Sequence, residues 1–276
     1  MGRTIKLILY FFAYQFAITY AILIGYLVWK HTLEVPTLDD PVFLNLTLAG
    51  QVISSLAIGI HLAWAKYAPL NKQTLSPVSS KLLIVCVLFI LGMGAWTNYL
   101  NEALNLPNTM EDLFSKTMVN PLGIVAVVIM APIIEEMLFR GAIEGHLLRK
   151  WKNPVWPIVV SSLLFGLVHG NPAQIPFAFV LGLALGWVYY RTGSLLPGML
   201  MHFINNGSAV LMYWLVDDKD ATLNELMGFG GAACYAITGV ILTAVCIWLI
   251  GKKLTPQPYC WRKEETENND TTNDIK

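Results

Sequence analysis

The fold is decided by residues 121–148, "PLGIVAVVIMAPIIEEMLFRGAIEGHLL", an apolar stretch that contains two adjacent glutamates and an arginine. The stretch exceeds the ~20 apolar residues that a helix needs to cross the hydrocarbon core of a bilayer. A charged side chain at the centre of a bilayer costs about 2.5–3.5 kcal/mol. The stretch therefore predicts a membrane-spanning helix whose Glu135, Glu136 and Arg140 face other helices rather than lipid.

The composition of the whole chain agrees with a membrane protein. Of its 276 residues, 55% are hydrophobic and only 13% are charged, whereas soluble domains have about 25% charged residues. The net charge is zero, so no basic surface favours binding to nucleic acid. The expected partners are therefore membrane lipids, with no nucleic acid.

Apolar segments recur along the chain and predict an all-α, polytopic membrane helical bundle of about eight transmembrane helices. The fifth and sixth segments are short, and the prolines in the intervening "GNPAQIP" (170–176) cannot continue a helix. These two segments form either two short spans or one broken re-entrant pair. The eight segments are 5–29, 43–65, 82–100, 121–148, 155–170, 174–190, 195–216 and 229–251.

The basic residues predict the orientation of the eight spans, because cytoplasmic loops are rich in lysine and arginine. If the N-terminus is cytoplasmic, the inside segments hold most of the 18 basic residues. The sequence therefore predicts a multi-pass protein of the cell (plasma) membrane with both termini cytoplasmic. The basic residues on the inside are Arg3, Lys6, Lys66, Lys72, Lys81, Arg149, Lys150, Lys152, Arg191, Lys252, Lys253, Arg262, Lys263 and Lys276.

Helical spacing predicts which of the intramembrane polar groups meet. Glu136 and Arg140 are four residues apart, so they share a helix face and are expected to form an ion pair. Glu135 is rotated from Glu136 by about 100°, which leaves its carboxylate free to face a water molecule. Asn205 is rotated by the same angle from its neighbour Asn206 and is predicted to be a packing residue.

The same four-residue spacing joins Phe165 to His169 and His202 to Asn206. Three predicted helices thus present a carboxylate, a histidine, and a histidine with an amide. Hydrolysis of a peptide bond needs these groups, because a carboxylate accepts a proton from water and donors stabilise the oxyanion. Buried carboxylates and histidines also mark transporters, so an ion-coupled transporter remains an alternative. Other polar groups near predicted span ends, among them Glu144, are expected to be solvated.

Three motifs lie in order along the chain: "EEMLFR" (135–140), "FGLVH" (165–169) and "HFINN" (202–206). With them the chain resembles the CAAX protease and bacteriocin-processing (CPBP) family, intramembrane proteases similar to the type II CAAX prenyl endopeptidase. The family pattern is Glu-Glu-x-x-x-Arg, then Phe-x-x-x-His, then His-x-x-x-Asn. The resemblance covers about residues 121–216, and this sequence does not depart from the pattern.

The resemblance implies a role for each motif residue. Glu135 would be the general base that activates water, and His169 would hold and orient that water. His202 and Asn206 would form the oxyanion hole. Arg140 is expected to neutralise Glu136, which would leave Glu135 ionised and basic enough to take a proton. The residues expected to hold the catalytic residues in place, without reacting themselves, are Glu136, Arg140 and Phe165.

The resemblance also leaves open whether a metal takes part, because the family carries the name metalloendopeptidase. Glu135, His169 and His202 could hold zinc, since catalytic zinc takes three such ligands plus water. The same residues can activate water without metal, which is the favoured reading, so no cofactor is assigned. The expected substrate is a hydrophobic or membrane-anchored peptide or protein, with or without a lipid modification. A bacteriocin-immunity or scaffold protein without turnover is the third alternative.

The predicted organisation has four parts. Transmembrane helices and an outer-surface segment fill residues 1–120, where 103–118 form either an interfacial helix or an ordered loop. A CPBP-like catalytic helical core covers 121–216, and a last transmembrane helix covers 217–251. The polar residues 252–276 lack apolar spacing and predict a disordered cytoplasmic tail.

Overall fold

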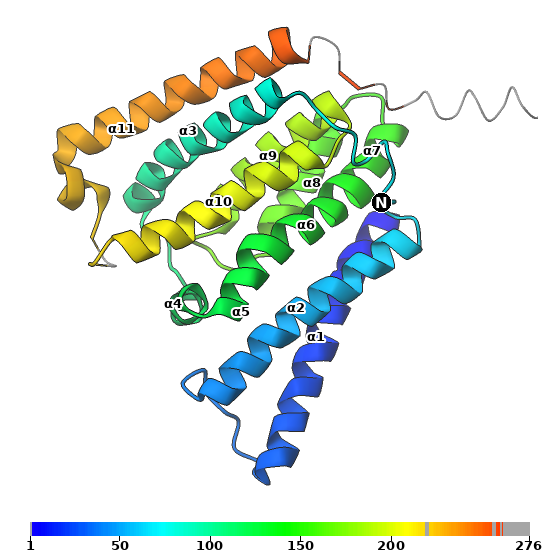
Figure 1. The fold of residues 1–276 in the computed structure, drawn as a ribbon, viewed down its shortest axis with the longest axis vertical. Coiled ribbons are helices and arrows are strands. Elements are labelled where there is room, and N and C mark those ends of the chain that lie inside the picture. Colours follow the sequence, from blue (N-terminus) through cyan, green and yellow to red (C-terminus); the bar gives the residue numbers. More distant parts are fainter. Residues whose placement is uncertain (1, 219–220, 256–257, 260, 262–276) are drawn as a thin grey trace, which may run out of the picture.

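The computed structural model describes residues 2–218, 221–255, 258–259 and 261, and every regular element in this part of the chain is a helix (Figure 1). Eight of the described helical segments follow one another in the order that the apolar segments predict, and one further short helix, α4 (Glu111–Val119), lies between the third and the fourth. The all-α, polytopic bundle is therefore confirmed. The segments are α1 (Gly2–Lys30), α2 (Pro41–Trp64), α3 (Ser80–Leu104), Pro121–Lys150, α8 (Val155–Leu167), α9 (Ile175–Thr192), α10 (Leu196–Leu215) and Leu223–Leu254.

Six of these segments are long and apolar enough to cross a membrane, and the other two are α8 and α10. Helix α8 has 13 residues, fewer than the ~20 that a straight span requires. Helix α10 has 20 residues, but His202, Asn205 and Asn206 lower its hydropathy. The two helices that depart from a simple span are thus those that carry or lead to the predicted catalytic histidines.

The segment Pro121–Lys150, which carries both glutamates, is not one regular α-helix. Two π-helical stretches, η1 (Val125–Met130) and η2 (Glu136–Glu144), alternate with shorter α-helices. Proline has no N–H to donate to the preceding turn, and Pro132 is the second residue after η1. π-helical turns are rare and occur frequently at functional sites. The α-helical parts are α5 (Pro121–Ile124), α6 (Ala131–Glu135) and α7 (Gly145–Lys150).

Local caps fix where several helices begin. The Asp40 carboxylate accepts hydrogen bonds from the backbone N–H groups of Val42 and Phe43 at the start of α2. Ser79 caps α3 in the same way. Thr222 and Glu225 form a reciprocal capping box at the start of α11 (Leu223–Trp248). Such caps satisfy N–H groups that have no partner within the helix.

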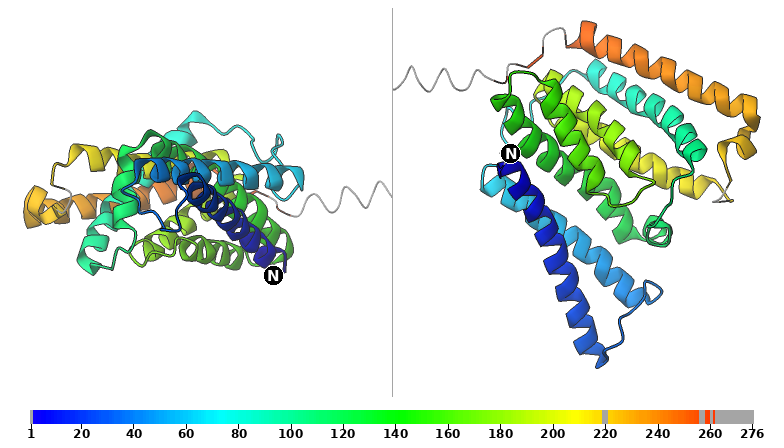
Figure 2. Two further views of the ribbon diagram at one scale, coloured as in Figure 1. Left: turned by 90° about the horizontal axis from the view of Figure 1, so that it is seen from below. Right: turned by 180° about the vertical axis from the view of Figure 1, so that it is seen from behind.

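Helices α1 and α2 form a hairpin that lies beside the other helices, and its far end diverges from them (Figures 1 and 2). On the opposite side α3 and α11 pack closely, and a Cβ atom at Gly92 would lie 3.1 Å from the Gly239 carbonyl oxygen. Helices α6, α8, α9 and α10 lie between these two pairs. The predicted site residues belong to this middle group.

Two boundaries differ from those predicted. Residues 103–118 comprise the end of α3, a connection and the short helix α4 (Glu111–Val119). The last helical segment begins at Leu223 and continues through η3 (Leu249–Leu254), so residues 252–254 are helical rather than part of a disordered tail. The Trp261 indole N–H also donates to the Tyr190 carbonyl at 3.3 Å. Of the predicted tail, residues 256–257, 260 and 262–276 lie outside the described residues.

Candidate active site

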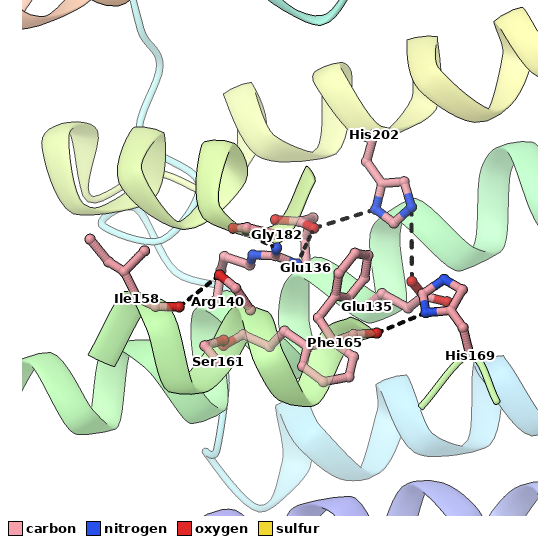
Figure 3. Close-up of polar contacts among 11 residues, drawn as sticks. Glu135, Glu136, Arg140, Ile158, Ser161, Phe165, His169, Gly182 and His202 are labelled. Carbon is pink, nitrogen blue, oxygen red and sulfur yellow. Dashed lines mark hydrogen bonds and ion pairs between the residues drawn. The ribbon is translucent and has the colours of Figure 1, made fainter. Parts of the chain in front are cut away.

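The predicted site residues come from three helical segments that meet in the middle of the bundle (Figure 3). Glu135 ends α6, and Glu136 and Arg140 follow in η2. Phe165 lies near the end of α8, and His169 lies in the turn that follows this helix. Helix α10 supplies the two remaining residues, His202 and Asn206.

The predicted ion pair between Glu136 and Arg140 is confirmed. Arg140 Nη1 lies 2.8 Å from Glu136 Oε1, and both side chains are almost completely buried. Arg140 Nη2 also donates to the carbonyl oxygen of Gly182 on α9 at 3.1 Å. A buried charge is tolerated only when it is paired and hydrogen-bonded, and here both conditions are met. The pair ties η2 to α9.

The Phe165 ring lies at the centre of the site and is fully buried. The imidazole rings of His169 and His202 approach it edge-on, with centroid distances of 5.1 and 5.6 Å. The Arg140 guanidinium lies 4.5 Å from the Phe165 centroid, a cation–π arrangement. Both imidazole rings and the arginine therefore pack against the same aromatic ring.

His202 lies between the two adjacent glutamates. Its Nε2 is 3.8 Å from Glu135 Oε2, and its Nδ1 is 3.4 Å from Glu136 Oε1. Glu136 is held by Arg140, whereas Glu135 retains an exposed side-chain fraction of 19%. The Glu135 Oε2 atom is itself buried and accepts no hydrogen bond from a described protein group. Of the two carboxylates, Glu135 is therefore the one that is not held by Arg140.

His169 is oriented by its own helix. Its Nδ1 lies 2.7 Å from the Phe165 carbonyl oxygen. A carbonyl oxygen can only accept a hydrogen bond, so Nδ1 carries the proton. In the neutral ring, Nε2 then presents a lone pair. His169 is thus prepared to accept a hydrogen bond from water or to bind a metal.

Asn206 lies one helical turn beyond His202 on α10 and is held to the start of the glutamate segment. Its Nδ2 donates to the Val127 carbonyl at 2.8 Å, while its Oδ1 accepts from Asn205 Nδ2 at 3.1 Å. The prediction that Asn205 points away as a packing residue is therefore wrong. One N–H of Asn206 remains for another acceptor.

Three further residues lie at the site: Gly198, whose place before His202 predicts a close approach of helices, and Gly182 and Glu144, which the sequence does not assign to the site. Gly182 supplies a carbonyl to Arg140, and no sequence signal distinguishes it from other glycines in spans. At Gly198 a Cβ atom would lie 2.8 Å from Glu136 Oε2, so the glycine lets α10 approach the ion pair. Glu144 was predicted to be solvated but is fully buried, and neither carboxylate oxygen has a hydrogen-bond partner among the described groups. The prediction failed because Glu144 lies near a predicted span end, where side chains are usually solvated.

The donor set does not form a recognisable metal site. Among the residues that the structure describes, no group of three or more His, Cys, Asp or Glu side chains is placed to hold a metal ion. Glu135, His169 and His202 are therefore not arranged as ligands of one ion.

Comparisons with known proteins agree with the three motifs. Residues 117–208 match the family described as "Type II CAAX prenyl endopeptidase Rce1-like". All the site residues predicted from the sequence fall within this range. The matched part runs from the end of α4 to the middle of α10 and thus contains the whole Glu135–His202 constellation.

Two curated relatives match the chain at 32% identity. One is the membrane-embedded CAAX protease MroQ of Staphylococcus aureus (strain USA300), over 114 residues, 40% of this chain and 46% of the relative. The other is the "Putative membrane peptidase YdiL" of Bacillus subtilis (strain 168), over 92 residues, 33% of this chain and 37% of the relative.

The matched regions thus span less than half the length of either relative. No solved structure matches the chain significantly. The apolar helices and these relatives agree on a multi-pass membrane protein. The resemblance predicted from the three motifs is confirmed: over residues 117–208, this chain is similar to the Rce1-like type II CAAX prenyl endopeptidases.

Proposed function

We propose that this protein is an intramembrane endopeptidase that uses Glu135 to activate water. The observation that carries the proposal is the placement of a partly accessible carboxylate 3.8 Å from an imidazole nitrogen within the bundle. A gap of this size between polar atoms exceeds a direct hydrogen bond and suits a shared water molecule. The similarity to a membrane-embedded CAAX protease supports the same class of reaction.

In the proposed first step, Glu135 removes a proton from a water molecule as its oxygen attacks the peptide carbonyl carbon. The Nε2 lone pair of His169 accepts a hydrogen bond from the second O–H of this water, which keeps its hydrogen, and so orients the attacking oxygen. The attack forms a tetrahedral intermediate whose former carbonyl oxygen carries the negative charge. Preorganised hydrogen-bond donors at that oxygen lower the barrier.

His202 and Asn206 are the donors that we assign to this oxyanion. In this proposal both ring nitrogens of His202 carry a proton, Nδ1 toward Glu136 Oε1 and Nε2 on the side of Glu135. Asn206 retains one N–H beyond its bond to Val127. The intermediate collapses when the C–N bond breaks and the proton held by Glu135 passes to the leaving nitrogen. Glu135 returns to its ionised form, and both products carry complete valences.

Glu136 and Arg140 are assigned a supporting role. Their pair fixes η2 against α9 and holds a carboxylate oxygen 3.4 Å from His202 Nδ1. Because Arg140 neutralises Glu136, the negative charge next to the reacting centre resides on Glu135. In this proposal residues 121–216 form the catalytic core, and the helices before and after them are peripheral.

The proposed substrate is a peptide or protein whose scissile bond lies near a hydrophobic or membrane-anchored end, with or without a lipid group. The chain would lie in the cell membrane with both termini cytoplasmic, as the lysine and arginine distribution predicts. A site within the bilayer favours substrates that partition into the membrane. No nucleic acid takes part.

The decisive experiment compares the peptides of cells that carry the wild-type protein, Glu135→Gln or the matched surface variant Glu34→Gln, at equal protein levels. Glu34 is exposed in the connection after α1. At least one hydrophobic precursor should persist uncleaved only in the Glu135→Gln cells. Purified wild-type protein should cleave a synthetic peptide that spans the cleavage site of that precursor, and the Glu135→Gln protein should not.

Two outcomes would favour the alternatives. Ion-driven uptake into vesicles that survives Glu135→Gln, without any cleavage, would favour a transporter. Identical peptide profiles for all three proteins, together with an immunity phenotype that Glu135→Gln retains, would favour a scaffold or bacteriocin-immunity protein without turnover.

A further inference from the structure

His169 does not lie within a helix, so its position depends on the residues around it. It occupies the turn after α8, where its backbone N–H donates to the Gly166 carbonyl at 3.2 Å. The next residue, Gly170, has φ +64°, a conformation that glycine adopts without steric cost. A histidine in such a turn needs an external support if it is to hold a fixed position.

Asn171, two residues after His169, provides a contact to a distant part of the chain. Its side chain is completely buried. Its Oδ1 accepts hydrogen bonds from the Thr109 backbone N–H at 3.1 Å and the Thr109 hydroxyl at 3.4 Å. Its Nδ2 donates to Asn108 Oδ1 at 2.9 Å. The amide thus uses both its acceptor and its donor on the connection between α3 and α4.

Backbone hydrogen bonds strengthen the same junction. The Ala173 N–H donates to the Pro107 carbonyl at 3.2 Å. The Asn171 carbonyl accepts from the N–H groups of Gln174 and Ile175 at 2.9 and 3.0 Å, which starts α9. Asn171 therefore connects three elements: the His169 turn, the first turn of α9, and residues 107–109.

We propose that Asn171 is a positioning residue that holds His169 at the catalytic water through its anchor on residues 107–109. This inference rests on the proposed function, because it assumes that His169 orients the water. It also gives a role to the α3–α4 connection, which lies outside the segment matched to the family. The geometry of that connection would set the rate of catalysis without contacting substrate.

The chain offers a matched pair of variants that test the anchor from its exposed side. Asn108→Ala removes the acceptor for Asn171 Nδ2, whereas Asn108→Asp keeps a carboxylate oxygen in its place. Asn108 is exposed, so neither change disturbs the core. Glu111→Ala, an exposed position nearby, is the control.

The kinetic test uses the synthetic peptide from the experiment above and purified, folded protein. A misplacement of about 1 Å can lower a rate about 100-fold. We expect Asn171→Ala and Asn108→Ala to lower kcat by about 10- to 100-fold with KM changed less than about twofold. Asn108→Asp and Glu111→Ala should retain the wild-type kcat. A merely structural contact would lower thermal stability and leave the kcat of the folded fraction unchanged, which would overturn the proposal.

A second readout does not depend on substrate. Diethyl pyrocarbonate acylates the neutral imidazole lone pair, and mass spectrometry of the digested protein reports each histidine separately. Asn171→Ala and Asn108→Ala should change the acylation rate of His169 at least threefold while that of the exposed His31 stays constant. An unchanged His169 rate in both variants would overturn the proposal. If Glu135→Gln cleaves the peptide like wild type, the proposed function fails instead, and the acylation result still decides the anchor.

Discussion

Replacing Arg140 with methionine should lower the free energy of unfolding by about 3 kcal/mol. Methionine fills much of the volume of the arginine stem but leaves the buried Glu136 carboxylate without its partner, which at present lies 2.8 Å away. Breaking a buried ion pair by removing one member costs about 3–5 kcal/mol. The lower end applies because the unfolded chain in a membrane-like solvent also finds partners for its polar groups.

Equilibrium unfolding by SDS in mixed micelles measures this change, and the nine tryptophans of the chain supply the fluorescence signal. Arg149→Met is the matched control, because Arg149 lies at the end of α7 and is partly exposed. It should change the unfolding free energy by less than about 0.5 kcal/mol. The double variant Glu136→Leu/Arg140→Met removes both charges and should recover most of the lost stability, since an uncharged pair needs no desolvation.

Two results would refute the reasoning about the pair. The first is a loss below about 1 kcal/mol for Arg140→Met, which would mean that Glu136 finds another partner or is solvated. The second is a double variant whose cost equals the sum of the two single variants. Additive effects mean that two residues do not interact, contrary to the short contact between Glu136 and Arg140.

Three further predictions concern two single substitutions and the removal of metal. Gly198→Ala should lower both stability and activity, because its new Cβ would meet Glu136 Oε2 at 2.8 Å and overpacking costs about 1–3 kcal/mol. The control Gly207→Ala should be tolerated, because its Cβ would have no atom closer than 3.6 Å. Equal thermal stability of the two variants would refute this prediction. Glu144→Met should raise the unfolding free energy by about 1 kcal/mol, since it removes a buried carboxyl without a hydrogen-bond partner; a loss of stability would mean that the carboxyl is satisfied. Prolonged treatment of purified active protein with 1,10-phenanthroline should leave peptide cleavage unchanged, whereas loss of cleavage that zinc restores would establish the metal-dependent reading.

The sequence was sufficient to predict the helices and the principal polar residues. Long apolar runs allow only helices in a bilayer, because every backbone polar group must be satisfied internally. The four-residue spacing of Glu136 and Arg140 gave their ion pair directly, and the same spacing placed His169 beside Phe165. These features depend on contacts within one helix, which periodicity describes well.

Features that depend on a second helix could not be predicted in the same way. The Gly182 carbonyl reaches Arg140 only because α9 packs against η2, and no periodic pattern in either segment records that approach. Glu144 was assigned to solvent from its distance to the span end, but α8 and α9 cover it, and a Cβ at Gly186 would lie 2.6 Å from its carboxylate. The π-helical stretches also rotate later residues away from the positions that 3.6-residue periodicity predicts.

The arrangement of polar groups bears on the choice between hydrolysis and transport. A proton or ion relay needs polar groups in series along a path across the bilayer. Hydrolysis needs groups that converge on one carbonyl and one water. Arg140, His169 and His202 all pack against one ring, Phe165, and Glu135 lies near His202. Because these groups gather around one side chain rather than in series along a path, the geometry favours the peptidase.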